Sequence, residues 1–357
     1  MENLDYLITA AAACVLSLGL TPLMIGLSKK LKILDMPNAR KAHTKPMPLM
    51  GGVAIYIATI IAALLFILVF VKGLDMSLVI AFIVGITGVT AMGFIDDIMH
   101  LSAKRRLLIL FILALIVLVG CLQFYFPPAL MQSGLTMVLT VSLIVVVWIV
   151  AVTNAINFAD GLDGLASCLS FVSALGFATL FYLQGRTQLA LPTALALCGA
   201  IFGFLPYNFN PAKVFMGDAG SMFIGFMLGI FSIMSMSDEA VKDFIVPIYL
   251  ILVPTVDMAM AVLRRLIMKK SVMKPDKMHF HHILNRKFKS QRLVVLILTL
   301  AQAISAALGV LIYRYDLHLF GWVLMGLIAA AAIAYTLFKA RRLMEMERAE
   351  QAATLVK

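Results

Sequence analysis

Apolar segments alternate with short charged stretches along almost the whole chain. A helix needs about 20 apolar residues to cross the hydrocarbon core of a bilayer, so each such segment is a candidate transmembrane helix. The pattern predicts an all-α, polytopic integral membrane protein with about eleven transmembrane helices. The predicted spans lie near residues 4–27, 50–71, 77–95, 107–126, 135–157, 164–184, 189–209, 220–237, 244–263, 293–313 and 319–338.

The composition supports the same fold class. Of the 357 residues, 62% are hydrophobic and 13% are charged, and the mean hydropathy is +1.02. Soluble domains contain about half apolar and a quarter charged residues. The N-terminal sequence MENLDYL lacks the basic region of a signal peptide, which predicts a retained first helix. The four cysteines have no paired spacing, so neither a disulfide framework nor a zinc site is expected.

The loops between the predicted helices differ sharply in basic charge. One set of alternate loops, with the tail from residue 339, holds 25 of the 29 lysines and arginines. By the positive-inside rule this set is cytoplasmic, which puts the N-terminus outside and the C-terminus inside. The net charge of +11 then reflects orientation, and no nucleic-acid partner is expected. The predicted cytoplasmic loops are 28–49, 96–106, 158–163, 210–219 and 264–292.

Acidic residues gather at the predicted cytoplasmic face. In IDDIMHLSAKRR, Asp96 and Asp97 follow an apolar run directly, where two like charges need a cation or a basic partner. Lys104 and Arg106 are suitable partners, either for these acids or for phosphates. The alternative is a helix end with solvated acids. The functional interpretation is a pair of carboxylates that handles a metal ion or a proton.

The sequence NAINFADGLDGLA is more specific. Asn154, Asn157, Asp160 and Asp163 are spaced by three, which in a helix would gather their side chains on one face. The glycines between them permit a turn and expose backbone N–H groups to an anion or a base. The alternative is an ordinary cap and turn that lead into the next helix.

Two further motifs lie in the later cytoplasmic loops. In YNFNPAKVFMGDAGS, Asp218 precedes a glycine-opened helix, which suits a Mg²⁺ ligand beside a phosphate site; a capping residue is the alternative. In DKMHFHHILN, His279, His281 and His282 lie among many basic residues. Without matching cysteines, phosphate recognition is more economical than zinc, and a solvated basic loop is the alternative.

One acid lies inside a predicted span. Asp257 falls within 244–263, a few residues before Arg264 and Arg265. An intramembrane carboxylate is a functional candidate, and pairing with a nearby arginine is the alternative.

Together these parts indicate phosphoryl transfer at a membrane surface. Carboxylates for Mg²⁺, glycine-opened helix ends and a basic histidine loop are typical of such sites. The donor would come from the cytosol, and the acceptor phosphate would be carried on a lipid. No Walker-type sequence is present, which disfavours an ATPase. We therefore expect a single transmembrane catalytic domain over residues 1–338, followed by a charged cytoplasmic tail over 339–357.

These motifs, in this order, resemble the polyprenyl-phosphate N-acetylhexosamine-1-phosphate transferases. The resemblance extends from RKAHTKPMPLMGG, which begins at residue 40, to His282. It is greatest to bacterial enzymes that load N-acetylglucosamine-1-phosphate onto undecaprenyl phosphate and so initiate wall teichoic acid or related polymers. The peptidoglycan branch typically has a triple histidine followed by Phe-Glu, whereas this chain has His279-Phe280-His281-His282-Ile283.

The resemblance implies the reaction and its ligands. The lipid phosphate would attack the β-phosphorus of UDP-N-acetylglucosamine and release UMP, with Mg²⁺, or alternatively Mn²⁺, as cofactor. It also implies a bacterial cytoplasmic membrane, an active site that faces the cytoplasm, and a homodimer. Leu49 and Ile283 stand where the family often has basic residues, and Arg106 stands where lysine is common, which leaves the sugar preference open.

The resemblance also implies a role for each site residue. Asp218 would bind the metal, and Asp96, supported by Asp97, would accept the proton of the lipid phosphate or hold the phosphate. The remaining expected contacts are with the substrates: Asn157, Asp160 and Asp163 in the nucleotide and metal pocket; Asn208 and Phe215 at the uracil; His279, His281 and His282 at the phosphates or sugar; and Arg40, Lys41, His43, Lys104 and Arg106 as further polar contacts.

Other functions remain open at the level of sequence. The same chemistry could act on UDP-N-acetylgalactosamine or on the peptidoglycan precursor. A transporter or lipid flippase would also have many spans, although it would favour charges at the midplane and repeated halves. An inactive membrane scaffold is disfavoured because the motif acids are all present.

Overall fold

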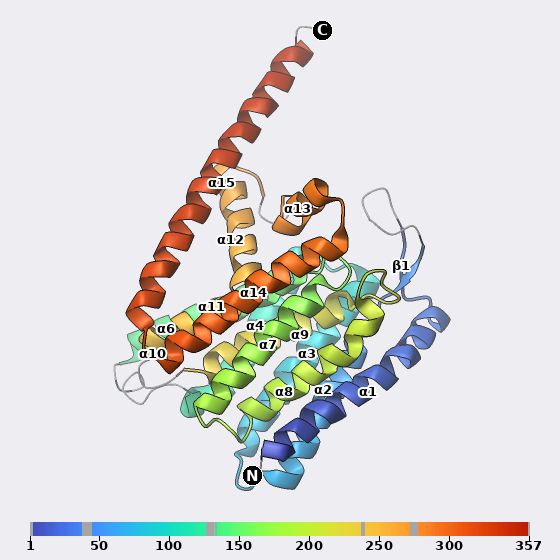
Figure 1. Ribbon diagram of the computed structural model, residues 1–357, viewed down its shortest axis with the longest axis vertical. Coiled ribbons are helices and arrows are strands. Elements are labelled where there is room, and N and C mark those ends of the chain that lie inside the picture. Colours follow the sequence, from blue (N-terminus) through green and yellow to red (C-terminus); the bar gives the residue numbers. More distant parts are fainter. Residues whose placement is uncertain are drawn as a thin grey trace.

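Long helices that run side by side make up most of the molecule (Figure 1). The computed structural model describes residues 3–37, 45–125, 132, 134–236, 240–271 and 278–355. Within them the all-α prediction is confirmed, apart from one short antiparallel pair of strands. The elements are α1 (Asn3–Lys30), β1 (Leu34–Asp35), β2 (Met47–Pro48), α2 (Gly51–Phe70), α3 (Met76–Met99), α4 (Ala103–Tyr125), α6 (Leu135–Ala159), α7 (Leu165–Leu183), α8 (Ala190–Asn208), α9 (Gly217–Met234), α10 (Ala240–Asp243), α11 (Ile245–Leu250), α12 (Leu252–Ile267), α13 (Phe280–Phe288), α14 (Gln291–Arg314) and α15 (His318–Leu355).

Nine helices in the described part of the chain are long and apolar enough to cross a membrane. They coincide with nine of the predicted spans, so the chain is a multi-pass membrane protein. The predicted span 107–126 is α4, whose first turn carries Lys104, Arg105 and Arg106. The predicted span 244–263 is interrupted. The total of eleven spans and the orientation of the termini therefore stay predictions.

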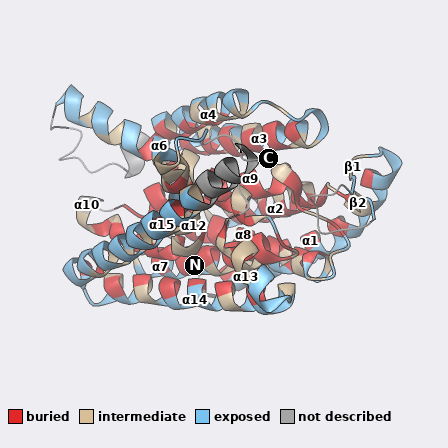
Figure 2. Ribbon diagram, turned by 90° about the horizontal axis from the view of Figure 1, so that it is seen from above, coloured by how far each residue is buried: buried red, intermediate tan, exposed pale blue. Residues whose placement is uncertain are grey.

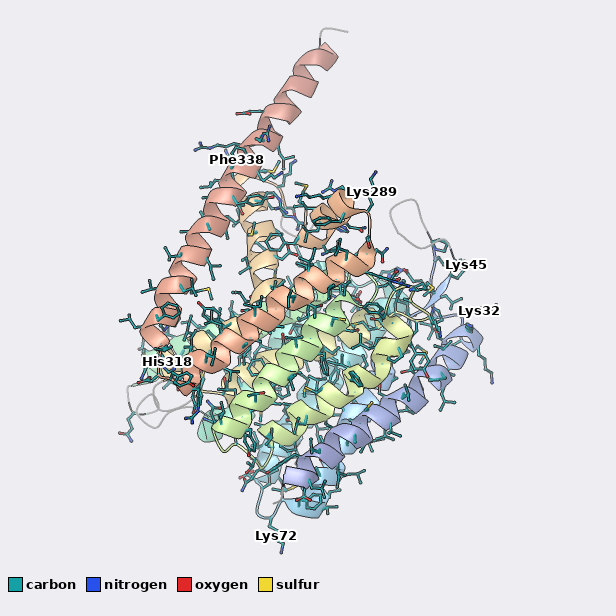
Figure 3. All side chains as sticks on the ribbon, in the orientation of Figure 1. Lys32, Lys45, Lys72, Lys289, His318 and Phe338 are labelled. Carbon is teal, nitrogen blue, oxygen red and sulfur yellow. The ribbon has the colours of Figure 1, made fainter. Side chains whose placement is uncertain are left out.

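The loops sort to two ends of the bundle. Figure 3 shows Lys32, Lys45 and Lys289 toward the end from which the C-terminal part of α15 projects, and Lys72 at the opposite end. The N-terminus of α1 also lies at that opposite end (Figure 1). This separation agrees with the division of the loops into two sets by basic charge.

Helix α9 lies at the centre of the bundle. Nearly all of its residues are buried, and it packs against α2, α3 and α6; Figure 2 shows it within the buried interior. Gly225 and Gly229 let α6 approach closely, because an added Cβ would lie 2.7 Å from the Cα of Thr153 and 3.0 Å from the Cα of Ile149. Helix α9, which begins at Gly217, is therefore held rigidly by close packing against its neighbours.

The prediction of one continuous helix over 244–263 is wrong, because the chain breaks at Ile251 between α11 and α12. Pro254 has no N–H for the carbonyl of Leu250, four residues earlier. The buried side chain of Gln302 on α14 supplies the missing partners: it donates to Leu250 O at 2.6 Å and accepts from Val253 N at 3.0 Å. Ser305 Oγ donates to Tyr249 O at 2.7 Å. A broken helix inside an apolar bundle is tolerated because these side chains satisfy its backbone.

Replacing Gln302 with Leu is expected to destabilise the protein by about 1–3 kcal/mol, because buried backbone groups at the break would lose their partner. Thermal unfolding in detergent measures the effect. Gln188→Leu is the matched control, since Gln188 is exposed between α7 and α8. Equal melting temperatures for the two variants would contradict this account of the break.

Candidate functional site

Asp97 joins the end of α3 to the start of α9. Its Oδ1 accepts from the backbone N of Asp218 at 2.8 Å, and its Oδ2 accepts from the backbone N of Ala219 at 3.1 Å. The first N–H groups of a helix have no partner within it and favour a negative charge. Gly217 has φ +68, and an added Cβ would lie 2.5 Å from Asp97 Oδ2. The sequence predicted Asp97 as a support for Asp96, whereas the structure makes it the anchor of α9.

Asp96 faces a different set of partners. Its Oδ1 accepts from the backbone N of Leu101 at 2.7 Å, and its Oδ2 accepts from the Arg106 guanidinium at 2.9 Å. The same guanidinium lies 3.7 Å from Asp218 Oδ2. Arg106 therefore bridges two carboxylates that come from α3 and α9. Lys104, two residues earlier on α4, is exposed.

Asn157 on α6 holds the other oxygen of Asp218. Its amide nitrogen donates to Asp218 Oδ1 at 2.6 Å and to Ser221 Oγ at 2.9 Å. The Asp218 side chain is 32% exposed, so its carboxylate remains open to a ligand. Ser221 was missed by sequence reasoning, although it lies one turn after Asp218 on the same face of α9.

The four-residue series from 154 to 163 does not lie on one helical face, because α6 ends at Ala159. Asp160 and Asp163 lie in the turn before α7. Asp163 Oδ2 accepts from Asn210 Nδ2 at 2.9 Å and from the backbone N of Ala212 at 3.0 Å. Asp163 thus holds the loop between α8 and α9, and its contact with a nucleotide stays a prediction.

Asp160 is the acid of this turn whose charged form is disfavoured. Its burial, together with the nearby carboxylates of Asp218 and Asp163, raises its pKa to about 7. A group that resists ionisation among other carboxylates is one that a divalent cation would stabilise in its charged form.

The two residues expected at the uracil have different surroundings. Asn208 is only 2% exposed; its Oδ1 accepts from Ser167 Oγ at 2.7 Å, and its Nδ2 donates to Val214 O at 3.0 Å. Direct contact between Asn208 and a base stays a prediction that this burial disfavours. Phe215 is half-buried, and its backbone bonds Pro48 O at 2.9 Å and Gly51 N at 3.1 Å. The loop that carries Phe215 is thereby fixed to the start of α2.

The three histidines form one cluster at the start of α13. Ring centroids lie 5.7 Å apart for His279 and His281 and 4.2 Å apart for His281 and His282. Burial and the neighbouring His282 lower the pKa of His281 to about 3, so His281 is neutral. Its Nε2 lies against Gly161, where an added Cβ would collide with it. The histidine cluster therefore borders the turn that carries Asp160.

Three expected substrate contacts, Arg40, Lys41 and His43, lie outside the described residues. The strands that flank them pair Leu34 with Pro48 and Asp35 with Met47. This pairing brings the two ends of the first loop together beside α2.

The donor set fits a magnesium ion that also uses substrate oxygens. No group of three or more His, Cys, Asp or Glu side chains in the described part of the chain is arranged to hold a metal by itself. Mg²⁺ is commonly bound by one or two carboxylates together with substrate phosphates and water. Asp218, with its partly exposed carboxylate, and Asp160 meet that requirement.

Replacing Asp160 with Asn is expected to stabilise the metal-free protein more at pH 8 than at pH 5. The pKa of Asp160 rises from 3.8 to about 7 on folding, so its contribution to stability is lost as the pH rises through that interval. The gain at pH 8 should be about 1 kcal/mol, because water still reaches part of this largely buried carboxylate. Thermal unfolding with a chelator at both pH values measures it; an equal gain at both would contradict the proposed repulsion.

Comparison with known proteins identifies the family. Residues 79–236 match the model of glycosyl transferase family 4. A probable undecaprenyl-phosphate N-acetylglucosaminyl 1-phosphate transferase of Bacillus subtilis (strain 168) is 34% identical over 303 residues, which cover 84% of this chain and 83% of the relative. A decaprenyl-phosphate N-acetylglucosaminephosphotransferase of Mycolicibacterium smegmatis is 34% identical over 295 residues, covering 76% and 73% of the two chains.

A third relative is the undecaprenyl-phosphate alpha-N-acetylglucosaminyl 1-phosphate transferase of Escherichia coli O157:H7. It is 30% identical over 321 residues, covering 86% of this chain and 84% of the relative. These relatives match most of this chain and most of their own length, in agreement with the order of the motifs and with a site at one end of the bundle. The chain therefore belongs to glycosyl transferase family 4, among the polyprenyl-phosphate N-acetylhexosamine-1-phosphate transferases.

Proposed function

We propose that this protein transfers N-acetylglucosamine-1-phosphate from UDP-N-acetylglucosamine to undecaprenyl phosphate and releases UMP. The observation that carries the proposal is the meeting of Asp96, Asp218 and Arg106 at the ends of α3, α9 and α4. This meeting places carboxylates and a guanidinium together at the end of a membrane bundle. The names of the relatives point to the same acceptor and sugar phosphate.

In the proposed reaction, an oxygen of the lipid phosphate attacks the β-phosphorus of the nucleotide sugar. The bond from that phosphorus to the bridging oxygen breaks, and the electron pair leaves with UMP. Asp218, helped by Asp160, would hold Mg²⁺, which neutralises charge on the diphosphate. Arg106 would bind phosphate oxygens once the substrates compete for it. Asp96, which already has two donors, would position Arg106 rather than act as a base, because a phosphate monoester is largely ionised at pH 7.

The nucleotide and sugar would lie between the loop before α9 and the histidine cluster. Phe215 would stack on the uracil, and the histidines would contact the phosphates or the sugar. His281 would act as a neutral ring that packs against the turn, because its pKa is lowered to about 3. Arg40, Lys41, His43 and Lys104 would supply further polar contacts.

The proposed setting is the bacterial cytoplasmic membrane, with the active site toward the cytoplasm and the product used for wall teichoic acid or a related polymer. The charge of the loops supports this orientation. The donor panel described next would reveal a different UDP-N-acetylhexosamine or the peptidoglycan precursor as the substrate. A mass measurement would show whether the protein is a homodimer.

The test uses purified protein, undecaprenyl phosphate, Mg²⁺ and a panel of UDP-sugars, with the nucleotide products resolved. UMP that forms only from UDP-N-acetylglucosamine, and only with lipid and metal, is the expected result. UDP as the product would mean ordinary glycosyl transfer and would overturn the mechanism. Absence of nucleotide release with every donor would favour a transporter.

Replacing Asp218 with Asn is expected to lower UMP release roughly 100-fold or more, because the metal would lose its carboxylate ligand. The melting temperature should change little, since Asn157 and the backbone still hold the position. Asp75→Asn is the control: Asp75 is exposed at the start of α3 and accepts from Ser77 N at 2.7 Å. Near-normal activity of Asp218→Asn at saturating Mg²⁺ would contradict the assignment of Asp218 as the metal ligand.

A further inference from the structure

An aspartate from α12 meets the first histidine of the cluster. Asp257 Oδ2 lies 3.0 Å from His279 Nδ1, and Asp257 Oδ1 accepts from the backbone N of Phe280 at 2.8 Å. Both side chains are largely buried, at 12% exposed for Asp257 and 8% for His279. The aspartate therefore caps α13 and binds the histidine ring at the same time.

The position of Asp257 depends on the break between α11 and α12. The helix that carries it begins at Leu252, where Gln302 satisfies the interrupted backbone. The sequence left pairing with Arg264 or Arg265 open, and the structure places the carboxylate against His279 and the backbone of Phe280. No spacing rule connects these residues, because 22 positions separate Asp257 from His279.

The carboxylate fixes which nitrogen of His279 carries a proton. A carboxylate accepts hydrogen bonds only, so Nδ1 must be the donor, and Nε2 is the nitrogen left for another ligand. When Nε2 donates to an anionic oxygen, Asp257 compensates the positive charge of the doubly protonated ring. The ring cannot turn freely, because it packs beside Phe158 and stacks on His281 at an interplanar angle of 7°.

We propose that Asp257 is a positioning residue for transfer: it accepts from the Nδ1–H of His279 and stabilises the doubly protonated ring, so that Nε2–H donates to a phosphate oxygen of the nucleotide sugar. This inference rests on the proposed function and adds to it the residue that sets the state of the histidine. Asp257 itself does not touch the substrate. Its effect passes through the orientation and tautomer of one ring.

Asp257→Asn separates this role from helix capping. Asparagine keeps an oxygen for the backbone N of Phe280, but it presents an NH₂ donor to His279 Nδ1 in place of the carboxylate oxygen. A neutral His279 must then accept at Nδ1 and carry its proton on Nε2. It can still donate to a phosphate oxygen, but it lacks the positive charge that the Asp257 carboxylate would stabilise. The fold and the cap are retained while the tautomer changes.

The first readout is spectroscopic and does not depend on turnover. Full-length protein labelled with ¹⁵N-histidine contains six histidines, and His279→Gln assigns the signal of interest. Long-range ¹H–¹⁵N spectra at about pH 8 should show Nδ1–H for wild-type His279 and Nε2–H for Asp257→Asn. An Nε2–H tautomer in the wild type would overturn the proposal.

The second readout is kinetic. Asp257→Asn should lower kcat/KM for UDP-N-acetylglucosamine roughly 10- to 100-fold, the value of one hydrogen bond to a charged group, with an unchanged melting temperature. Asp257→Glu should recover part of the loss, because it restores a carboxylate. It is also the second variant if the asparagine form fails to fold.

The matched control is Asp316→Asn. Asp316 Oδ1 lies 2.8 Å from His318 Nδ1, a similar pair at the other end of α14. Helix α14 has 24 residues and is about 36 Å long, and Figure 3 shows His318 far from Lys289, which directly precedes that helix's N-cap. This control should transfer normally.

Equal kcat/KM for Asp257→Asn and wild type would overturn the positioning role. A wild-type protein that releases no UMP would overturn the proposed function, and the tautomer result would then stand by itself.

Discussion

The structure depends on the carboxylate of Asp97 at the N-terminus of α9. Helix α9 is buried along nearly its whole length, so its first N–H groups need acceptors from the protein itself. Asp97 provides two acceptor oxygens from α3. The approach is so close that an added Cβ at Gly93 would collide with the backbone of Asp218, and one at Gly52 with the backbone of Gly220. These contacts fix the backbone of Asp218 before any ligand is bound.

The charge balance around this anchor explains why the site suits a cation and a phosphate. Arg106 contacts Asp96 at 2.9 Å and Asp218 at 3.7 Å, while burial and the nearby carboxylate of Asp218 raise the pKa of Asp160 to about 7. The carboxylates thus outnumber the guanidinium that bridges them. A divalent ion would relieve that repulsion, and it would free Arg106 for a phosphate. The two adjacent carboxylates singled out in the sequence have separate structural roles: Asp97 anchors α9, and Asp96 pairs with Arg106.

The sequence predicted the membrane helices well because hydrophobic length is a local property. It also predicted which acids share one face, since loop charge gives the topology. It failed where a distant side chain decides local structure. Gln302 satisfies the interrupted backbone at the break near Ile251. Asp163 accepts hydrogen bonds from Asn210 and Ala212 and does not continue the helical spacing of the preceding residues. Asp257 and His279 likewise meet only through tertiary packing. Pro254 is a local signal for the break, but the sequence does not show that Gln302 and Ser305 of α14 satisfy the interrupted backbone.

The central claim is that Asp218 holds a divalent ion at the start of α9. Titration of purified protein with Mn²⁺ in the presence of UDP, followed by electron paramagnetic resonance, tests this claim without relying on turnover. The account predicts one bound Mn²⁺ per wild-type chain and an affinity at least about tenfold weaker for Asp218→Asn at an unchanged melting temperature. Equal Mn²⁺ affinity for the two proteins would contradict it.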